Sequence, residues 1–120
     1  MKYIKDKDIK LTILDKKNIK INFKRVFFLD ARKKVIRGNH AHKKCLQTFF
    51  SLKGTFSIDC ESRKGKKQRF KIIPGKTLKS IKPFTWVKVN LKKDQICGVL
   101  CDRVFEEDDY IRDYNQFKKF

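Results

Sequence analysis

The chain has 120 residues and a formal net charge of +19 at pH 7, because 32 Lys and Arg outnumber 13 Asp and Glu. This length predicts one domain over residues 1–120, which buries about two-thirds of the surface of the unfolded chain and would gain stability from a second copy. Such a charge is typical of nucleic-acid-binding proteins, but the lysines are spread from Lys2 to Lys119 without a dense run. We therefore predict a solvated basic surface and no binding to nucleic acid.

Strand-like patterns begin near Ile9 and continue to about Cys101. The first clear example has Ile19, Ile21 and Phe23 on one face, against Lys and Asn residues on the other. Because successive side chains of a strand point to opposite faces, this two-residue period predicts a strand. The same period recurs in residues 55–60, 78–81, 86–91 and 96–101.

Turn signals separate these segments at intervals of roughly 8 to 12 residues, the spacing expected of an antiparallel sandwich or barrel. They are Lys53-Gly54, residues 63–66 and Pro74-Gly75. We predict an all-β domain of about eight to ten strands.

The tail differs from the rest of the chain. A run of acidic residues, Glu106 to Asp109, precedes an apolar-periodic segment at residues 110–117. Since carboxylates stabilise a helix N-terminus, this pattern predicts a short C-terminal helix or turn.

The four cysteines contain no Cys-x-x-Cys pair and each lies in an apolar stretch, which predicts buried free thiols in a reducing compartment. They are Cys45, Cys60, Cys97 and Cys101. Residues 2–10 alternate charges and contain no apolar segment, so neither a signal peptide nor a membrane span is expected. We predict a cytoplasmic protein.

The only two histidines, His40 and His42, lie together in the segment 37–44. On a strand, residues i and i+2 point to the same side, so both imidazoles should face one space, with the small Ala41 between them. The alternative is a chance pair of exposed histidines on a basic strand.

The spacing around this pair resembles the first sequence motif of the cupin superfamily. Gln47 follows His42 by five residues, and Gly54 follows Gln47 by seven. The resemblance implies a small cupin or jelly-roll β-barrel with the histidines inside. Many cupins bind a metal through such histidines and another histidine from a later strand. This chain has no third histidine and Gln47 is a weak ligand, so we predict no metal.

Three segments narrow the resemblance to the sugar-nucleotide 3,4-ketoisomerases, namely residues 25–28, 37–44 and 109–117. The resemblance implies a homodimer without a cofactor that moves the keto group of dTDP-4-keto-6-deoxyglucose from C4 to C3. It also implies a separate aminotransferase that aminates the product at C3, on the way to lipopolysaccharide or another glycosylated product.

Migration of a keto group requires a base that removes the proton α to the carbonyl, giving an enediol or enediolate that is reprotonated at the next carbon. Histidine suits this task because its ordinary pKa lies near neutrality. The resemblance implies that either His40 or His42 carries the proton between C3 and C4 while the other positions the sugar. We favour His42 as the shuttle.

Three cations are candidates for binding the diphosphate, since Arg offers a planar fork of donors and Lys a point charge. Arg37 and Arg25 match the family's Arg-Gly-x-His-Ala-His and Arg-Val motifs. Lys44 shares the parity of the histidines, so it would face the same cavity if the strand stays regular. The alternative for each is an ordinary solvated cation.

Val87 departs from the family pattern, in which Trp is often followed by His or another polar residue. By resemblance, this position lies near the sugar and influences which face of C4 is protonated.

Two other interpretations stay open. A related nucleotide-sugar epimerase of the same fold would also remove a proton α to a carbonyl. A non-catalytic β-barrel would instead bind a sugar or a nucleic acid without turnover.

Overall fold

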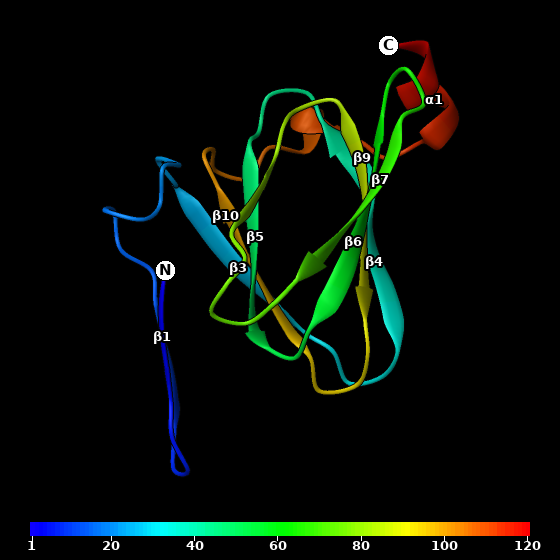
Figure 1. The fold of residues 1–120 in the computed structure, drawn as a ribbon. Coiled ribbons are helices and arrows are strands. Elements are labelled where there is room, and N and C mark those ends of the chain that lie inside the picture. Colours follow the sequence, from blue (N-terminus) through cyan, green and yellow to red (C-terminus); the bar gives the residue numbers. More distant parts are fainter.

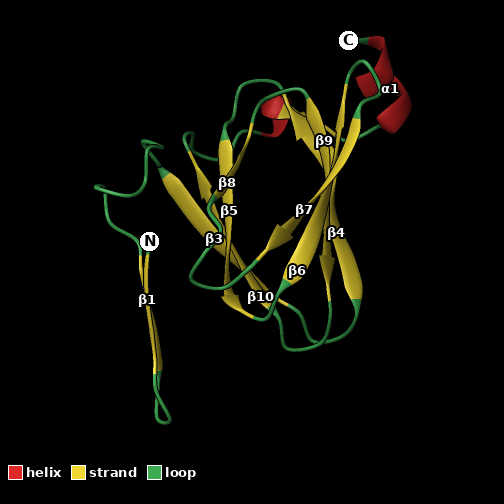
Figure 2. Cartoon of the chain, viewed as in Figure 1, coloured by secondary structure: helices red, strands yellow, loops and turns green.

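The computed structural model describes residues 1–120 and consists mainly of two antiparallel sheets that face each other (Figure 1). One sheet has the order β3 (Arg25–Asp30), β10 (Ile96–Cys101), β5 (Gln47–Lys53) and β8 (Lys79–Ile81). The other has the order β11 (Tyr110–Ile111), β4 (Val35–His42), β9 (Thr85–Leu91), β6 (Phe56–Ser62) and β7 (Lys67–Ile72). This arrangement confirms the predicted all-β, cupin-type fold (Figure 2).

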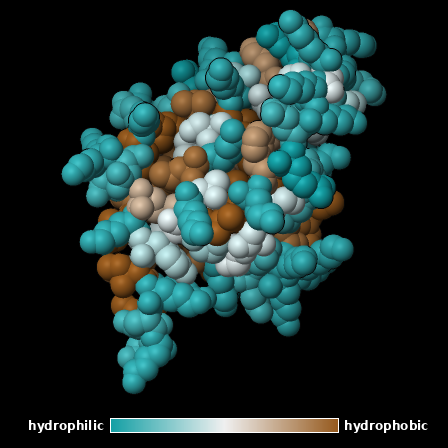
Figure 3. Space-filling view, in the orientation of Figure 1, coloured by the Kyte–Doolittle hydropathy of each residue, from teal (hydrophilic) through white to brown (hydrophobic).

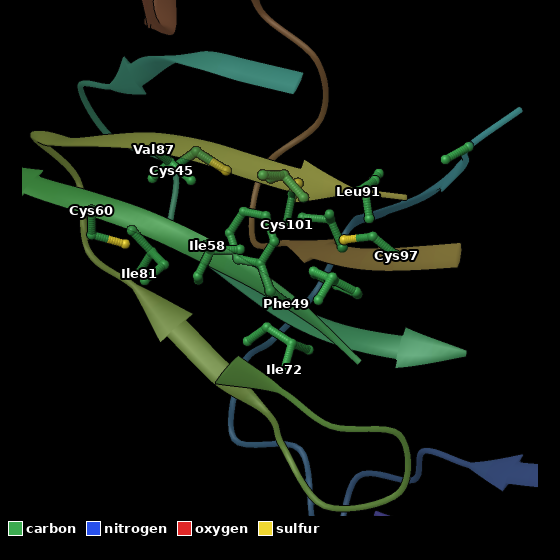
Figure 4. Packing of buried hydrophobic residues seen from close by; sticks show 14 residues of the cluster. Cys45, Phe49, Ile58, Cys60, Ile72, Ile81, Val87, Leu91, Cys97 and Cys101 are labelled. Carbon is green, nitrogen blue, oxygen red and sulfur yellow. The ribbon is translucent and has the colours of Figure 1, made fainter. Parts of the chain in front are cut away.

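The core lies between the two sheets. In β6, Phe56, Ile58 and Cys60 are buried while the residues between them are partly exposed, which confirms the alternation read from the sequence. These side chains belong to a cluster of 14 buried residues that both sheets supply (Figure 4). Burying a side chain such as that of Ile58 stabilises the fold by about 1.5–3 kcal/mol, so the facing sheets hold each other together.

The strand predicted through Ile19, Ile21 and Phe23 is wrong, since no strand lies between Ile13 and Arg25. Instead, Asp15 forms a turn in which its carbonyl oxygen accepts a hydrogen bond of 2.9 Å from the amide of Ile19. Ile19 and Ile21 are still buried, in a second cluster with Phe50 and Leu100. The apolar pattern therefore reflects burial of an irregular segment against the four-stranded sheet.

A hairpin of β1 (Lys2–Lys5) and β2 (Lys10–Ile13) projects from the body of the molecule (Figure 1). The Asp6 carboxylate accepts hydrogen bonds from the amides of Asp8 and Ile9, at 2.7 and 2.8 Å, and so shapes the turn. With this hairpin and the two-residue β11, the chain has eleven strands, compared with the eight to ten predicted.

The C-terminal segment folds back onto the five-stranded sheet. A short 3-10 helix, η1 (Glu107–Asp109), leads into β11, and helix α1 (Tyr114–Lys119) follows, which confirms the predicted helical end. The Asp113 side chain caps α1 by accepting a hydrogen bond of 3.1 Å from the amide of Gln116. Because Tyr110 pairs with His42 in the β11–β4 ladder, the tail lies directly beside the histidines.

In Figure 3 hydrophilic side chains surround the rim of the visible face, and hydrophobic and intermediate residues occupy its centre. None of the helices has the length and apolar character needed to cross a lipid bilayer. All four cysteines are buried and free, as the sequence predicted.

Candidate active site

A bulge in β4 sets the geometry of the histidine segment. Gly38 and Asn39 have φ angles of +90° and +55°, and the β4–β9 register shifts between Gly38 and His40. Gly38 therefore opposes Lys88, while His40 opposes Val87. The extra residue resets the alternation of side chains, so that Arg37 and His40 both line one cavity.

This cavity has a volume of about 420 Å³ and lies between the two sheets. Residues from β3, β4, β5, β9, β10 and β11 line it, including His40, Gln47 and Val87. A second hollow of about 400 Å³, bordered by Asp59 and Trp86, contains neither histidine. The first combines apolar walls with convergent polar groups, as ligand sites usually do, and we take it as the candidate active site.

His40 borders the cavity with one ring nitrogen fixed by the backbone. Its Nδ1 lies 3.1 Å from the carbonyl oxygen of Gly38. A carbonyl oxygen can only accept, so Nδ1 carries the proton and Nε2 presents a lone pair. Burial and the neighbouring His42 lower the pKa of His40 to about 4, and its imidazole is therefore neutral at physiological pH.

His42 is held by a carboxylate instead of a carbonyl. Its Nδ1 donates a hydrogen bond of 2.8 Å to Oδ2 of Asp109, and both side chains are buried. The other oxygen of Asp109 accepts a hydrogen bond of 2.6 Å from the amide of Lys44. The Nε2 atom of His42 is buried and has no hydrogen-bond partner. The arrangement fixes the tautomer of His42 and leaves Nε2 as a free acceptor.

The two members of this His42–Asp109 pair shift each other's ionisation. Burial lowers the pKa of His42, and the hydrogen bond from its ring to Asp109 only partly offsets that effect. Burial alone would raise the pKa of Asp109, but hydrogen bonds from His42 and from the Lys44 amide outweigh it and hold that pKa below its ordinary value. Asp109 is thus a fixed negative charge that can stabilise a protonated His42.

Tyr110 packs against both histidines. Its ring centroid lies 5.1 Å from that of His40 and 4.3 Å from that of His42, and the two imidazoles are 5.0 Å apart. The Arg112 guanidinium lies over the Tyr110 ring at 4.3 Å, and Arg25 donates a hydrogen bond of 3.4 Å to the Tyr110 hydroxyl. The three rings therefore form one packed group at the cavity wall.

The chain is matched over residues 1–120 by a family model described as FdtA, WxcM-like, C-terminal. The chain belongs to this family. A TDP-4-oxo-6-deoxy-alpha-D-glucose-3,4-oxoisomerase of Aneurinibacillus thermoaerophilus is 31% identical over 118 residues, covering 92% of this chain and 80% of that enzyme.

Two solved structures show the same fold. WlaRA, a TDP-fucose-3,4-ketoisomerase from Campylobacter jejuni, has 29% identity and a TM-score of 0.82, covering 98% of this chain and 89% of its own. QdtA, a sugar 3,4-ketoisomerase from Thermoanaerobacterium thermosaccharolyticum in complex with TDP, has 27% identity and a TM-score of 0.85, covering 98% and 88%. A variant of QdtA was solved with TDP-4-keto-6-deoxyglucose. These relatives confirm the resemblance to the 3,4-ketoisomerases.

The three cations predicted to bind the diphosphate, Arg37, Arg25 and Lys44, occupy different positions. Arg37 is exposed and lines the cavity, together with Arg112, which two hydrogen bonds of 2.7 and 2.9 Å anchor to Glu107. Arg25 is half-buried and reaches Tyr110 rather than the cavity itself. Lys44 is exposed outside the cavity lining, because β4 ends at His42 and the chain turns away. Only the Lys44 amide contributes to the site, through Asp109.

A metal could be held only where donors gather, and His42, Cys45 and Asp109 supply one donor atom each within 4.8 Å of one another. Both oxygens of Asp109 already accept hydrogen bonds, from His42 and from the amide of Lys44. The cluster is therefore organised as a hydrogen-bonded dyad beside a thiol.

Two residues of the site were not among those predicted. Asp109 and Arg112 lie in the 109–117 segment that carries the resemblance, but their roles depend on the pairing of β11 with β4. A strand of two residues leaves no periodic pattern, so that pairing could not be read from the sequence. The sequence signal that could have found Asp109 and Arg112 is their position in the segment 109–117, on either side of Tyr110.

Proposed function

We propose that this protein is a ketoisomerase that moves the keto group of dTDP-4-keto-6-deoxyglucose from C4 to C3. The observation that carries the proposal is the pair His40 and His42, each with Nδ1 bonded to a protein acceptor. His40 lines the cavity, whereas His42 lies behind the lining with its ring 5.0 Å from that of His40 and with a buried Nε2 that has no partner. The names of the relatives support the substrate class, since they are TDP-sugar 3,4-ketoisomerases.

His42 is proposed as the proton shuttle. Nε2 removes the proton from C3, the electrons of that C–H bond form the C3–C4 double bond, and the C4 oxygen becomes an enediolate. The C3 hydroxyl proton then passes to the C4 oxygen, the electrons of the O–H bond form the C3 carbonyl, and the electrons of the C3–C4 double bond take the proton back from Nε2 at C4, so atoms and electrons balance. Asp109 supports the step because its negative charge stabilises the imidazolium that His42 becomes.

His40 and Tyr110 are proposed to position the sugar. His40 lines the cavity, and its low pKa of about 4 makes it a weaker base than an imidazole braced by a carboxylate. Its neutral Nε2 accepts a hydrogen bond from a sugar hydroxyl. Tyr110 holds the orientation of both rings by packing against each of them.

The diphosphate is proposed to bind at the cationic side of the cavity. Arg37 is the primary contact, because it is exposed at the cavity and free to offer a planar fork of donors. Arg25 acts through Tyr110 and adds positive charge behind it. Direct contact by Lys44 stays a prediction, and its exposed position outside the cavity lining weakens that prediction.

The reaction is proposed to need neither metal nor redox cofactor, since C3 is oxidised as C4 is reduced within one molecule and only protons move. Treatment with EDTA followed by gel filtration should leave kcat unchanged. Loss of activity that Zn²⁺ or Mn²⁺ restores would contradict metal independence.

A homodimer is proposed, because Val26 and Phe28 expose 46% and 51% of their side chains on the edge strand β3. Contact with a second copy of the chain would remove this apolar edge from water and would prevent aggregation through it. Size-exclusion chromatography with light scattering should give twice the monomer mass.

Two further inferences stay predictions. They are the aminotransferase that would use the 3-keto product and the cytoplasmic location.

The deciding experiment incubates the purified protein with dTDP-4-keto-6-deoxyglucose in deuterated buffer. We expect a 3-keto product with deuterium at C4, because the proton held on Nε2 exchanges with the buffer before a proton is returned to C4, and proton NMR also gives the C4 configuration. His42→Asn should abolish exchange, whereas His40→Asn should raise KM and retain exchange. If exchange is lost only in His40→Asn, His40 is the proton shuttle. If the unmodified protein shows no exchange, the proposed ketoisomerase activity is wrong.

A further inference from the structure

The C-terminal tail is joined to the sheet beside the histidines by a very short ladder. In β11, Tyr110 pairs with His42 and Ile111 pairs with Ala41, and the chain then continues into helix α1 at one end of the five-stranded sheet (Figure 1). Two paired residues supply few hydrogen bonds, and each contributes only about 0.5–1.5 kcal/mol net. Side-chain packing beyond the ladder therefore has a large share in holding the tail in register.

Ala41 shows where this packing lies. Because successive side chains of a strand point to opposite faces, Ala41 points away from the two histidines that flank it. It is fully buried in a cluster with Trp86, Ile111 and Phe117, and the Phe117 side chain of α1 is fully buried there as well. The rings of Trp86 and Phe117 lie 5.5 Å apart. The small side chain between the histidines thus lets the tail pack directly behind them.

Glu61 ties the same helix to the sheet from strand β6. It opposes Trp86 in the β6–β9 ladder, and its side chain is only 12% exposed. Its Oε2 atom accepts a hydrogen bond of 2.6 Å from the Tyr114 hydroxyl and another of 3.0 Å from the Lys118 amine. Tyr114 and Lys118 lie near the two ends of α1, so one carboxylate oxygen holds the whole helix.

The segment that precedes α1 carries three groups of the site. Asp109 accepts the hydrogen bond from His42, and Tyr110 and Arg112 line the cavity. Only Arg112 and Asp113 separate β11 from α1. A connection of two residues has little slack, so a displacement of the helix is transmitted to β11 and to the side chains that it presents to the histidines.

We propose that Glu61 is a positioning residue for the reaction: it anchors α1 and thereby keeps Asp109 and Tyr110 in register with His42. Glu61 does not line the active-site cavity and acts only through the tail. The consequence for turnover rests on the proposed function, whereas the effect on the His42–Asp109 hydrogen bond does not.

The test compares Glu61→Ala with Asp59→Ala in the full-length protein. Asp59 is the matched control because it lies two residues earlier on the same face of β6, but its carboxylate pairs with Arg69 instead of the tail. Glu61→Ala should lower kcat by roughly 10- to 100-fold, since displacement of a catalytic group by about 1 Å can cost roughly 10²-fold in rate. Asp59→Ala should leave kcat unchanged.

Proton NMR gives a readout that does not depend on turnover. The Nδ1 proton of His42, held by Asp109, should give a downfield resonance that exchanges slowly with water and is identified by its loss in His42→Asn. We expect this resonance in the unmodified protein and in Asp59→Ala. It should be lost in Glu61→Ala under conditions where circular dichroism shows the variant to be folded. Glu61→Gln should restore it, because the Gln carbonyl oxygen can still accept from Tyr114.

A second variant, Tyr114→Phe combined with Lys118→Ala, applies if Glu61→Ala does not fold. It removes both donors and keeps the carboxylate, so it should also lose the resonance and the turnover. Adding Glu61→Ala to it should cause no further loss, because both changes break the same contact.

The outcomes separate the two proposals. A resonance that persists in the folded Glu61→Ala protein or in the Tyr114→Phe, Lys118→Ala protein would overturn the positioning role. An equal loss in Asp59→Ala, or a resonance missing from the unmodified protein, would overturn it as well. The predicted resonances in a protein that does not turn over dTDP-4-keto-6-deoxyglucose would contradict the proposed function alone.

Discussion

The carbonyl oxygen of Val87 lies 2.8 Å from the point where a Cβ atom on Gly38 would stand. Gly38 also has a φ angle of +90°, a conformation that L side chains rarely adopt. The bulge that aligns Arg37 with His40 therefore depends on the absence of a side chain at Gly38. This gives a physical reason for glycine in the Arg-Gly-x-His-Ala-His segment.

Substitution of Gly38 by Ala should damage both stability and the site. Strain at positive φ costs about 1–3 kcal/mol, and contact with the Val87 carbonyl adds to that cost. The control is Gly65→Ala, because Gly65 has a φ of +89° but its Cβ would meet only the Lys118 amine at 3.6 Å. Urea unfolding should show the larger loss for Gly38→Ala, with a raised KM. Equal losses in the two variants would mean that the Val87 contact contributes nothing.

Asp109→Asn should lower kcat by roughly 10²-fold or more, the usual scale of general acid–base catalysis. Asparagine cannot stabilise an imidazolium and can present its NH₂ group to Nδ1, which would favour the wrong tautomer of His42. Asp108→Asn is the control, since Asp108 is an exposed neighbour with the same charge. A lower rate for Asp109→Asn in single-turnover kinetics, with an unchanged KM, would support this role. Equal activity of the two variants would contradict it.

A plot of kcat against pH should show an acidic limb below the ordinary pKa of histidine. Both imidazoles have lowered pKa values, His40 to about 4, so both remain neutral as the pH falls from 8 through 6.5. Turnover should decline only when protonation of His42 removes the base. A limb centred at or above pH 6.5 would contradict the burial of His42.

The same shift predicts a loss of stability in acid. In the unfolded chain His40 takes up a proton near the ordinary histidine pKa of 6.5, whereas in the folded protein its pKa is lowered to about 4. The unfolded state therefore binds more protons in this window, and the free energy of unfolding falls as the pH drops through it. His40→Asn should flatten this part of the stability profile, as measured by urea unfolding at several pH values.

Arg37→Ala should raise KM by roughly 10–100-fold, because a charge-assisted hydrogen bond contributes about 1.5–3 kcal/mol. Arg69→Ala removes the same charge from the far side of the five-stranded sheet, where Arg69 pairs with Asp59. Steady-state kinetics should show little change for Arg69→Ala. An equal effect of the two variants would point to net charge rather than a diphosphate contact. Lys44→Ala in the same assay tests whether Lys44 contacts the substrate.

Much of the fold follows from local patterns, whereas the site depends on long-range pairing. The alternation in β6 and in residues 87–91 of β9 was readable because one face of each is buried against the core, whereas β10 is buried on both faces. The segment around Ile19 was misread because burial of an irregular loop leaves a similar apolar pattern. Lys44 was assigned to the cavity by extending the parity of β4, but that strand ends at His42. Asp109 could be assigned only from the β11–β4 register.

The link between His42 and Asp109 also bears on how the protein folds. These residues are separated by 67 positions, and most strands of both sheets lie between them in the chain. Contacts of such long range form slowly, because the loss of chain entropy precedes the gain from packing. Enzymatic competence should therefore appear late during refolding from urea, after the circular dichroism of the sheets has recovered.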